Sequence, residues 1–374
     1  MKLNRKSTYV PLFQLIAALV VAFFLYGILN PNTISFENLA LGTQTSSYQA
    51  KDKTGKTIHF LHMDSSELQA FEDLSNSSLD SVTLILGNSQ THSINQLKKK
   101  DKNFVELINE STSKDQKNGV VAFSFPNANL QELYLALDYA LRMNSRVNKL
   151  ILPVFMDDLR ESGVREVFFT ELFERNYQMD NITSVSQEIN SALAAGGKIV
   201  ESVNPVELTT QEKSEKWLNE LLAAELTIWG QRENMRGSMM NWLYMLRNTV
   251  FGIRPGSVRH MIAEPYNKNL DALKDILQLA KNKGISVYLY IPPIRSDVTL
   301  PYDQSELLKF NKDVNELATL NSAKIKDFSG IVPGKYWGYK EPTNFIDSIE
   351  VDFMHFQFQG HRILADSLIQ FISK

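Results

Sequence analysis

Three residue types that together activate a nucleophile occur in two short segments of this 374-residue chain. Ser89 follows an apolar run and the pair Gly87-Asn88, a pattern that predicts a buried strand running into a tight turn. Asp352 and His355 lie close together, just before an expected helix over residues 359–372. A serine hydroxyl needs a base, and the base needs a group that orients it. The residue types therefore predict a catalytic triad of Ser89, His355 and Asp352.

The elements around these segments alternate between strand and helix. The expected strands cover residues 81–86, 119–125, 149–155, 285–291 and 324–328, and the expected helices cover residues 94–108, 130–143, 270–283, 306–317 and 359–372. Such alternation predicts an α/β fold with a mostly parallel sheet flanked by helices. Active sites in such sheets lie at the carboxyl ends of the strands, which is where Ser89 follows the first core strand.

The N-terminal segment predicts a membrane anchor. Residues 1–9 carry only positive charge, and residues 10–29 are uncharged and long enough to span a bilayer. Positive residues stay on the cytoplasmic side, so the bulk of the chain is expected to face outward as a single-pass protein. The alternative is a cleaved signal peptide, which usually has a shorter apolar region and a small-residue cleavage site; residues 24–29 lack such a site, which favours the uncleaved anchor.

Two further boundaries follow from composition. Residues 30–79 are polar and uneven, and predict a stalk with an accessory segment before the main domain at residues 80–374. Residues 164–266 interrupt the strand and helix rhythm and predict a helical insertion. Its tryptophans, Trp217, Trp229 and Trp242, either pack that insertion or line a groove for sugar rings, and we favour packing.

Composition excludes several classes of function. The formal net charge of −3 argues against a nucleic-acid partner. The absence of cysteine excludes thiolate metal sites and cysteine nucleophiles. The histidines have no spacing typical of metal ligands, and His92 is expected at the surface. We expect neither a metal nor a cofactor.

The two segments of the triad resemble conserved blocks of the SGNH, or GDSL-like, hydrolase superfamily. Gly87-Asn88-Ser89 is similar to its first block, Gly-Asp-Ser, and Asp352-x-x-His355 is similar to its last. Residues 125–129 and 152–158 stand where the second and third blocks would be. The resemblance covers residues 80–374 and implies a three-layer sandwich with a serine acyl-transfer site.

The resemblance also implies that the oxyanion is bound from the segments that hold Gly87, Asn88, Asn127 and Asn129. Asp158 and Arg295 follow strands at the same edge of the sheet, which makes them candidates for substrate contacts. The chain departs from the family at the second-block glycine, replaced by Asn127 or Ala128, and at the third-block asparagine, where Asp157 and Asp158 would repel an oxyanion if ionised. Asp158 and Arg295 are equally compatible with structural ion pairs.

With an anchor, such a domain resembles accessory proteins of bacterial envelope acylation, including those of D-alanyl-lipoteichoic acid transfer and of exopolysaccharide O-acetylation. The resemblance implies a serine acyltransferase or esterase acting on acyl esters, acetyl above all, of an envelope polysaccharide, outside the cytoplasmic membrane and beside a membrane-bound O-acyltransferase. The alternative is a catalytically degenerate domain that binds glycan or scaffolds that partner. A phospholipid esterase is the third hypothesis.

Overall fold

The computed structural model describes residues 44–75, 79–112, 117–180, 183–196, 243–252, 254, 256–340, 342–345 and 349–373, with the single positions 14 and 18. The chain divides into two compact units. The larger unit comprises Thr43–Ser202, Pro255–Lys340 and Ile349–Lys374. In the smaller unit, residues 243–250 are helical, and the side-chain amide of Asn248 donates to the carbonyl of Thr343 at 2.9 Å.

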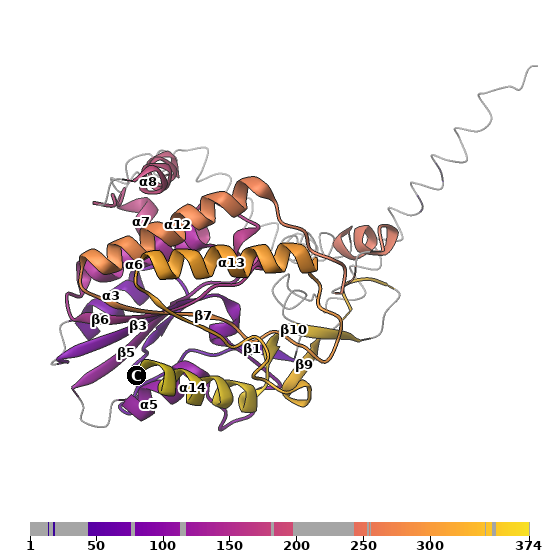
Figure 1. Cartoon of the computed structure of the whole chain (residues 1–374), viewed down its shortest axis with the longest axis horizontal. Helices are drawn as coiled ribbons and strands as arrows, with labels where there is room; N and C mark the ends of the chain where they lie inside the picture. The colour runs from indigo at the N-terminus through magenta and orange to yellow at the C-terminus, as the bar shows by residue number, and fades with distance from the viewer. Residues whose placement is uncertain are drawn as a thin grey trace, which may run out of the picture. The chain divides into compact units, whose positions relative to one another are not determined.

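A six-stranded parallel sheet forms the centre of the larger unit (Figure 1). In spatial order its strands are β2 (His59–Phe60), β5 (Asn118–Ser124), β3 (Ser81–Gly87), β6 (Val147–Pro153), β7 (Ser286–Ile291) and β8 (Lys324–Asp327). The chain leaves β3 for β5 on one side and later crosses to β6 on the other. In open α/β sheets this reversal of direction creates a crevice at the strand ends, and ligands bind there.

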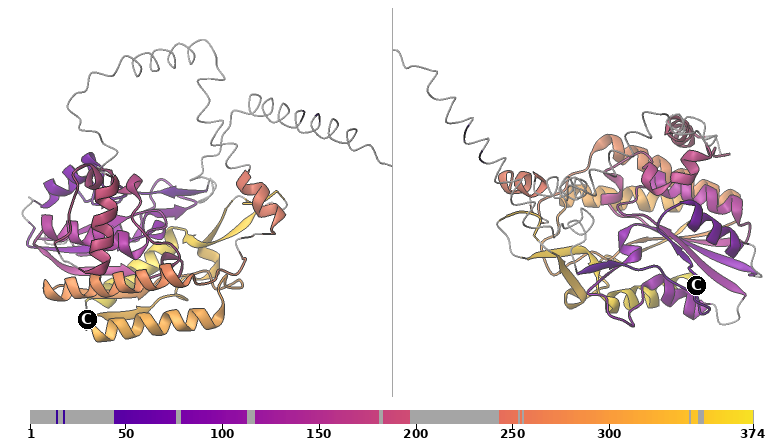
Figure 2. Two further views of the ribbon diagram at one scale, coloured as in Figure 1. Left: turned by 90° about the horizontal axis from the view of Figure 1, so that it is seen from above. Right: turned by 180° about the vertical axis from the view of Figure 1, so that it is seen from behind.

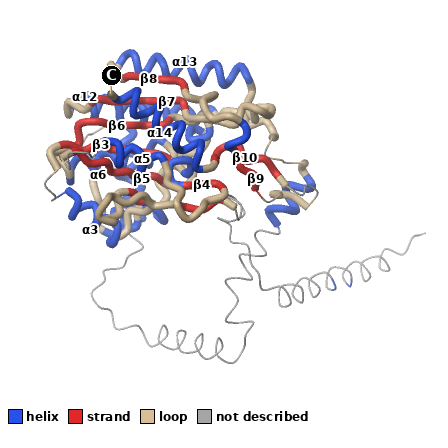
Figure 3. Tube along the Cα trace, turned by 90° about the horizontal axis from the view of Figure 1, so that it is seen from below, coloured by secondary structure: helices blue, strands red, loops and turns tan. Residues whose placement is uncertain are grey.

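Helices cover both faces of this sheet. They are α3 (Ser65–Ser75), α4 (Ser89–His92), α5 (Phe104–Thr112), α6 (Leu130–Met143), α7 (Thr170–Glu174), α8 (Ser184–Gly196), α12 (Ala263–Asn282), α13 (Gln304–Leu320) and α14 (Phe358–Ile372). Figures 1 and 3 show α6, α12 and α13 on one face, with α5 and α14 on the other. The side chains of Leu84, Ile85 and Leu86 in β3 are fully buried, as expected for a strand covered on both faces. This arrangement confirms the predicted α/β fold with a mostly parallel sheet.

Two small antiparallel sheets add to this core. β1 (Thr45–Ser47) pairs with β4 (Ser93–Asn95), and β9 (Trp337–Lys340) pairs with β10 (Glu350–Phe356). In both views of Figure 2, β9 and β10 lie beyond one end of the main sheet. The ring of Trp337 packs edge-on against Phe356, and both side chains are almost completely buried. The β9–β10 pair is therefore anchored in the core and carries Asp352 and His355.

The structure corrects three expectations. The helix predicted over 94–108 is wrong at its start: β4 and a turn precede α5, because Ile94 pairs with Ser46 in a sheet and is fully buried. The predicted domain boundary at residue 80 is also wrong, because β2 joins the main sheet through β5. A strand that the sequence analysis did not predict, β10, carries Asp352 and His355 just before α14.

The predicted anchor at residues 10–29 and most of the tryptophan-rich part of the insertion lie outside the described residues. Where the structure describes the chain, it contains no helix with both the length and the apolar character that a membrane span requires. The predicted tail, anchor and insertion stay predictions.

We expect Gly87→Ala to destabilise the larger unit by about 1–3 kcal/mol, because an added Cβ would collide with the Oγ1 and Cβ atoms of Thr91. Thr91→Ala in the same chain removes the hydroxyl and should recover part of that loss. Urea unfolding of the three proteins measures both effects. Equal stability of Gly87→Ala and the wild type would contradict this close approach.

Candidate active site

The structure brings the three predicted triad residues together. His355 Nε2 lies 3.0 Å from Ser89 Oγ, and His355 Nδ1 lies 2.9 Å from Asp352 Oδ2. All three side chains are nearly buried, with exposed fractions of 6% for Ser89, 3% for Asp352 and 7% for His355. Both ring nitrogens of His355 are therefore engaged, one by the hydroxyl and one by the carboxylate. This is the geometry of a nucleophile, a general base and the group that orients the base.

A short turn at the end of β3 positions Ser89. Asn88 is the N-cap of α4, with its side-chain Oδ1 accepting the N–H of Gln90 at 3.0 Å. Asn88 therefore caps this short helix, and the Ser89 hydroxyl is left for His355. The N–H of Ser89 begins the helix, where no intrahelical acceptor exists, so it is the backbone group best suited to stabilise an oxyanion formed on Ser89.

A turn within β10 positions the base and its partner. Asp352 Oδ1 accepts the N–H groups of Met354 and His355, each at 2.9 Å, while Oδ2 accepts from the imidazole. Burial alone would raise the pKa of Asp352, but the charge and hydrogen bond of His355 outweigh it and hold that pKa below its usual value. Asp352 is thus an ionised acceptor that fixes the Nδ1–H tautomer of His355.

Gln90 ties the nucleophile turn to the segments that surround it. Its Nε2 donates to the carbonyls of Met354 at 2.7 Å and Pro293 at 2.8 Å. One amide therefore joins the turn after β3, the loop after β7 and strand β10. Sequence reasoning missed this residue, because a glutamine beside a serine carries no signal for a contact 264 positions away.

Two asparagines predicted to bind the oxyanion have other roles in the structure. Asn129 is the N-cap of α6: its Oδ1 accepts from two backbone N–H groups, and its Nδ2 donates to the Gly163 carbonyl at 2.8 Å. Asn127 lies in the loop after β5 with a φ of +49°, a left-handed conformation that asparagine tolerates better than most residues. Its side chain is exposed. Glycine adopts this conformation without strain. Asn127 therefore adopts it in place of the glycine expected in the second block.

Asn88 and Asp158 form a buried pair beside the nucleophile. Asn88 Nδ2 donates to Asp158 Oδ1 at 2.8 Å, and the exposed fractions of the two residues are 2% and 5%. Burial raises the pKa of Asp158 well above its usual value, against a smaller opposing effect of the Asn88 hydrogen bond. Asp158 has no ion pair among the described residues. These surroundings favour the neutral acid, which does not repel an oxyanion.

The remaining two predicted residues have structural roles. Arg295 is 4% exposed, pairs with Asp297 and donates to the Gly338 carbonyl at 2.8 Å. Its guanidinium therefore braces β9, which is the structural alternative left open by the sequence. Because Gly87 has no side chain, the end of β3 can lie close to Thr91. We assign Gly87 this packing role and no contact with the substrate.

A second polar cluster lies behind the nucleophile turn. Ser124 Oγ lies 2.7 Å from both His59 Nε2 and His92 Nδ1, and Asn103 Nδ2 lies 3.2 Å from His59 Nδ1. Burial lowers the pKa of His59 to about 3 and that of His92 well below its usual value. The surface position expected for His92 is wrong, because its ring is 1% exposed. Across the described residues, no cluster of three or more potential ligands forms a metal site.

Comparisons with known proteins find similar architectures among solved structures. The chain is similar to an alpha/beta hydrolase enzyme from the metagenome of Lake Arreo, Spain (9% identity, TM-score 0.39, covering 79% of this chain and 95% of that one). It is also similar to an acetylxylan esterase from Geobacillus stearothermophilus (10%, 0.38, 80% and 97%) and to a GDSL-like lipase from Bacteroides thetaiotaomicron (10%, 0.38, 83% and 97%).

No family model matches the sequence, and no curated protein matches it. The chemistry of the site is therefore inferred from its own side chains.

The Asn88–Asp158 pair predicts a reciprocal exchange. Asn88→Asp alone places two carboxyl groups at hydrogen-bond distance. We therefore expect Ser89 to react with a fluorophosphonate at pH 8 at least about tenfold more slowly than in the wild type. Asp158→Asn replaces a neutral acid by its isostere and should change the rate by less than about threefold. The double variant restores a pair of one carboxyl group and one amide, and its rate should return close to that of Asp158→Asn. A loss in Asp158→Asn as large as that in Asn88→Asp would contradict a neutral Asp158.

The buried histidines predict loss of stability in acid. Burial lowers the pKa of His361 to about 3, while an unfolded histidine titrates near its ordinary value of about 6.5. The neutral ring therefore contributes stability that is complete above about pH 6.5 and declines as the pH falls toward 3. Replacing His361 by glutamine should reduce the slope of unfolding free energy against pH by about 1.4 kcal/mol per pH unit between about pH 5.5 and 4.

Urea unfolding across that range measures the slope. His62→Gln is the matched control, because it makes the same substitution at an exposed position. An unchanged slope in His361→Gln would show that this ring is protonated in the folded state.

Proposed function

We propose that this protein is a serine esterase or acyltransferase that uses Ser89 as its nucleophile. The observation that carries the proposal is the pair of hydrogen bonds to His355, from Ser89 on one nitrogen and to Asp352 on the other. A serine and a histidine that only capped helices or packed in the core would not need a buried carboxylate oriented in line with them.

The roles follow from this geometry. Ser89 Oγ attacks the carbonyl carbon of an ester as His355 Nε2 accepts its proton, and Asp352 stabilises the imidazolium that forms. The Ser89 N–H stabilises the oxyanion of the tetrahedral intermediate. His355 then returns the proton to the leaving alcohol, which leaves an acyl group on Ser89. Water or a second hydroxyl, activated by the same imidazole, takes the acyl group.

The proposed substrate is an acyl ester of a cell-envelope polysaccharide. Support for this location comes from the sequence, in which a basic tail at residues 1–9 precedes the apolar segment at 10–29. We propose that this segment anchors the catalytic unit outside a bacterial cytoplasmic membrane, within reach of envelope glycans. A membrane-bound O-acyltransferase is the proposed partner, because transfer outside the cell needs a source of activated acyl groups.

The alternative proposal, a scaffold without catalysis, drew its support from the altered second and third blocks. Two observations weaken that support. Asn127 adopts the left-handed backbone conformation in the second block, and Asn88 donates a hydrogen bond to Asp158, whose surroundings favour its neutral form. The departures are therefore compatible with catalysis.

The test is labelling of the full-length protein with a fluorophosphonate, with the adduct located by peptide mass. We expect an adduct on Ser89 and a fall in labelling rate of at least about 10³-fold in His355→Ala. His62→Ala is the control, since it removes an exposed imidazole from the same unit. Circular dichroism establishes that each variant is folded.

Absence of an adduct on Ser89 in folded wild-type protein would overturn the enzymatic proposal in favour of the scaffold. Equal labelling in His355→Ala and wild type would show that His355 is not the base.

A further inference from the structure

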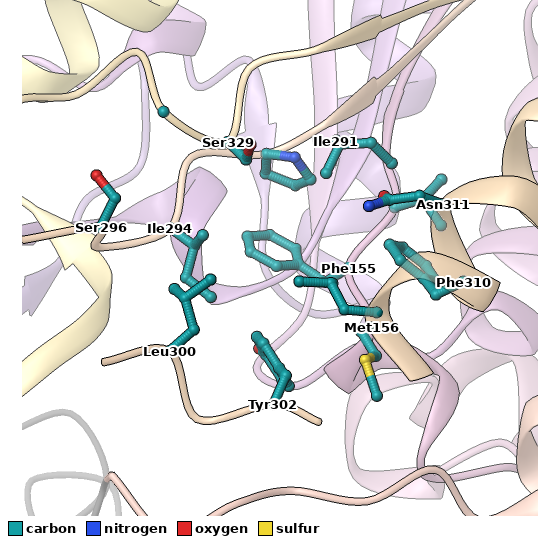
Figure 4. Close-up of a pocket in the computed structure, with 14 residues that line it drawn as sticks. Phe155, Met156, Ile291, Ile294, Ser296, Leu300, Tyr302, Phe310, Asn311 and Ser329 are labelled. Atoms are coloured by element: carbon teal, nitrogen blue, oxygen red, sulfur yellow. The ribbon is translucent and has the colours of Figure 1, made fainter. Parts of the chain in front are cut away.

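An apolar cavity opens between β6, β7 and α13, at the carboxyl edge of the sheet (Figure 4). Figure 4 shows the rings of Phe155, Tyr302 and Phe310 around it, with Ile294 and Leu300 on one side. Its volume is about 120 Å³. The triad mechanism does not use these side chains, which leaves the purpose of the cavity open.

Two walls of the cavity are bonded to the nucleophile turn. Met156 lines the cavity, and two residues later Asp158 accepts a hydrogen bond from Asn88, the residue before Ser89. Pro292 and Ile294 line it as well, and the carbonyl between them, that of Pro293, accepts from Gln90, the residue after Ser89. The residues on both sides of the nucleophile are therefore hydrogen-bonded to the two strand ends that form the cavity.

The segment that covers the cavity is held in place. The Tyr302 hydroxyl donates to Asp157 Oδ2 at 2.9 Å, and the same carboxylate pairs with Arg259. The N–H of Arg259 in turn donates to the Pro301 carbonyl at 2.8 Å. These bonds turn the tyrosine hydroxyl to Asp157 and fix the segment that carries Leu300. The cavity is thus a preformed space, which lowers the entropy lost when a ligand enters it.

The size and lining select the chemistry of an occupant. An apolar cavity of about 150 Å³ holds one benzene ring of six carbons, so about 120 Å³ corresponds to roughly four or five carbons. Aliphatic and aromatic side chains dominate the wall. Only the side chains of Ser296, Asn311 and Ser329 offer hydrogen bonds there. These are too few to replace the hydrogen bonds to water that a sugar ring with several hydroxyls would lose, whereas a hydrocarbon chain has none to lose.

We propose that this cavity binds the hydrocarbon tail of the acyl group that Ser89 transfers, and that it selects acyl chains of about six carbons over acetyl. This proposal rests on the proposed function, and it departs from the acetyl group expected from the sequence. The carbonyl carbon stays at Ser89, and the chain passes the 155–158 segment into the cavity.

The experiment compares methyl and pentyl fluorophosphonates as labels of Ser89 in the full-length protein, because the phosphorus stands for the carbonyl carbon of an acetyl or a hexanoyl group. Each buried methylene contributes about fourfold to binding, so the pentyl probe should react about tenfold faster or more. Leu300→Trp fills the cavity and should abolish that preference while leaving the methyl rate within about threefold of wild type. Leu308→Trp is the matched control, because Leu308 lies on α13 outside the cavity and is 64% exposed.

A parallel measurement separates this proposal from the proposed function. Binding of hexanoate and acetate to the Ser89→Ala protein, followed by saturation-transfer NMR, requires no catalysis. We expect saturation of hexanoate that Leu300→Trp removes and Leu308→Trp retains. Equal rates for the two probes, or hexanoate binding that survives Leu300→Trp, would overturn the acyl-chain assignment. Hexanoate binding in the cavity without labelling by either probe would instead overturn the catalytic role of Ser89, and the acyl-transfer assignment with it.

Discussion

The side-chain amide of Gln90 is the interaction on which the rest of the site depends. Its two hydrogens reach Pro293 and Met354, so a single planar group sets the spacing between the turn of Ser89 and the strand of His355. The side chains of Ser89 and His355 meet at 3.0 Å. The hydrogen bond from Gln90 to Met354 joins the residues next to them and so stabilises that contact. The same amide holds the loop after β7, so the base and one cavity wall are fixed together.

The polar groups around Ser89 share one electrostatic property. His59, His92 and His361 are buried with lowered pKa values, and Asp158 is buried with a raised one, so each favours its neutral form. Asp352 is the exception, because His355 and two backbone N–H groups stabilise its charge. The Asp352 carboxylate faces the His355 imidazole, so its charge stabilises the imidazolium that forms when the proton leaves the serine hydroxyl.

The sequence predicted those parts of the structure that depend on local pattern. Helix α6 has the predicted bounds because its apolar period and the capping box at Asn129 are local signals. Strand β10 was missed because Asp352 and His355 interrupt its apolar residues, so function obscured the strand pattern. The triad residues could be named from their types, but the Gln90 and Asp158 contacts could not. Those two depend on tertiary packing between segments far apart in the chain.

The 266 positions between Ser89 and His355 have a consequence for the order of folding. Closing so long a loop is slow relative to forming the helices and local turns, and parallel strand pairing adds further non-local steps. The turn of Ser89, which depends on its neighbours Asn88 and Gln90 and on β3, can therefore form before β10 docks. A chain at that stage holds its serine without a base. The reactivity proposed for Ser89 would then appear only in the final stage of assembly, so that partly folded molecules do not acylate themselves.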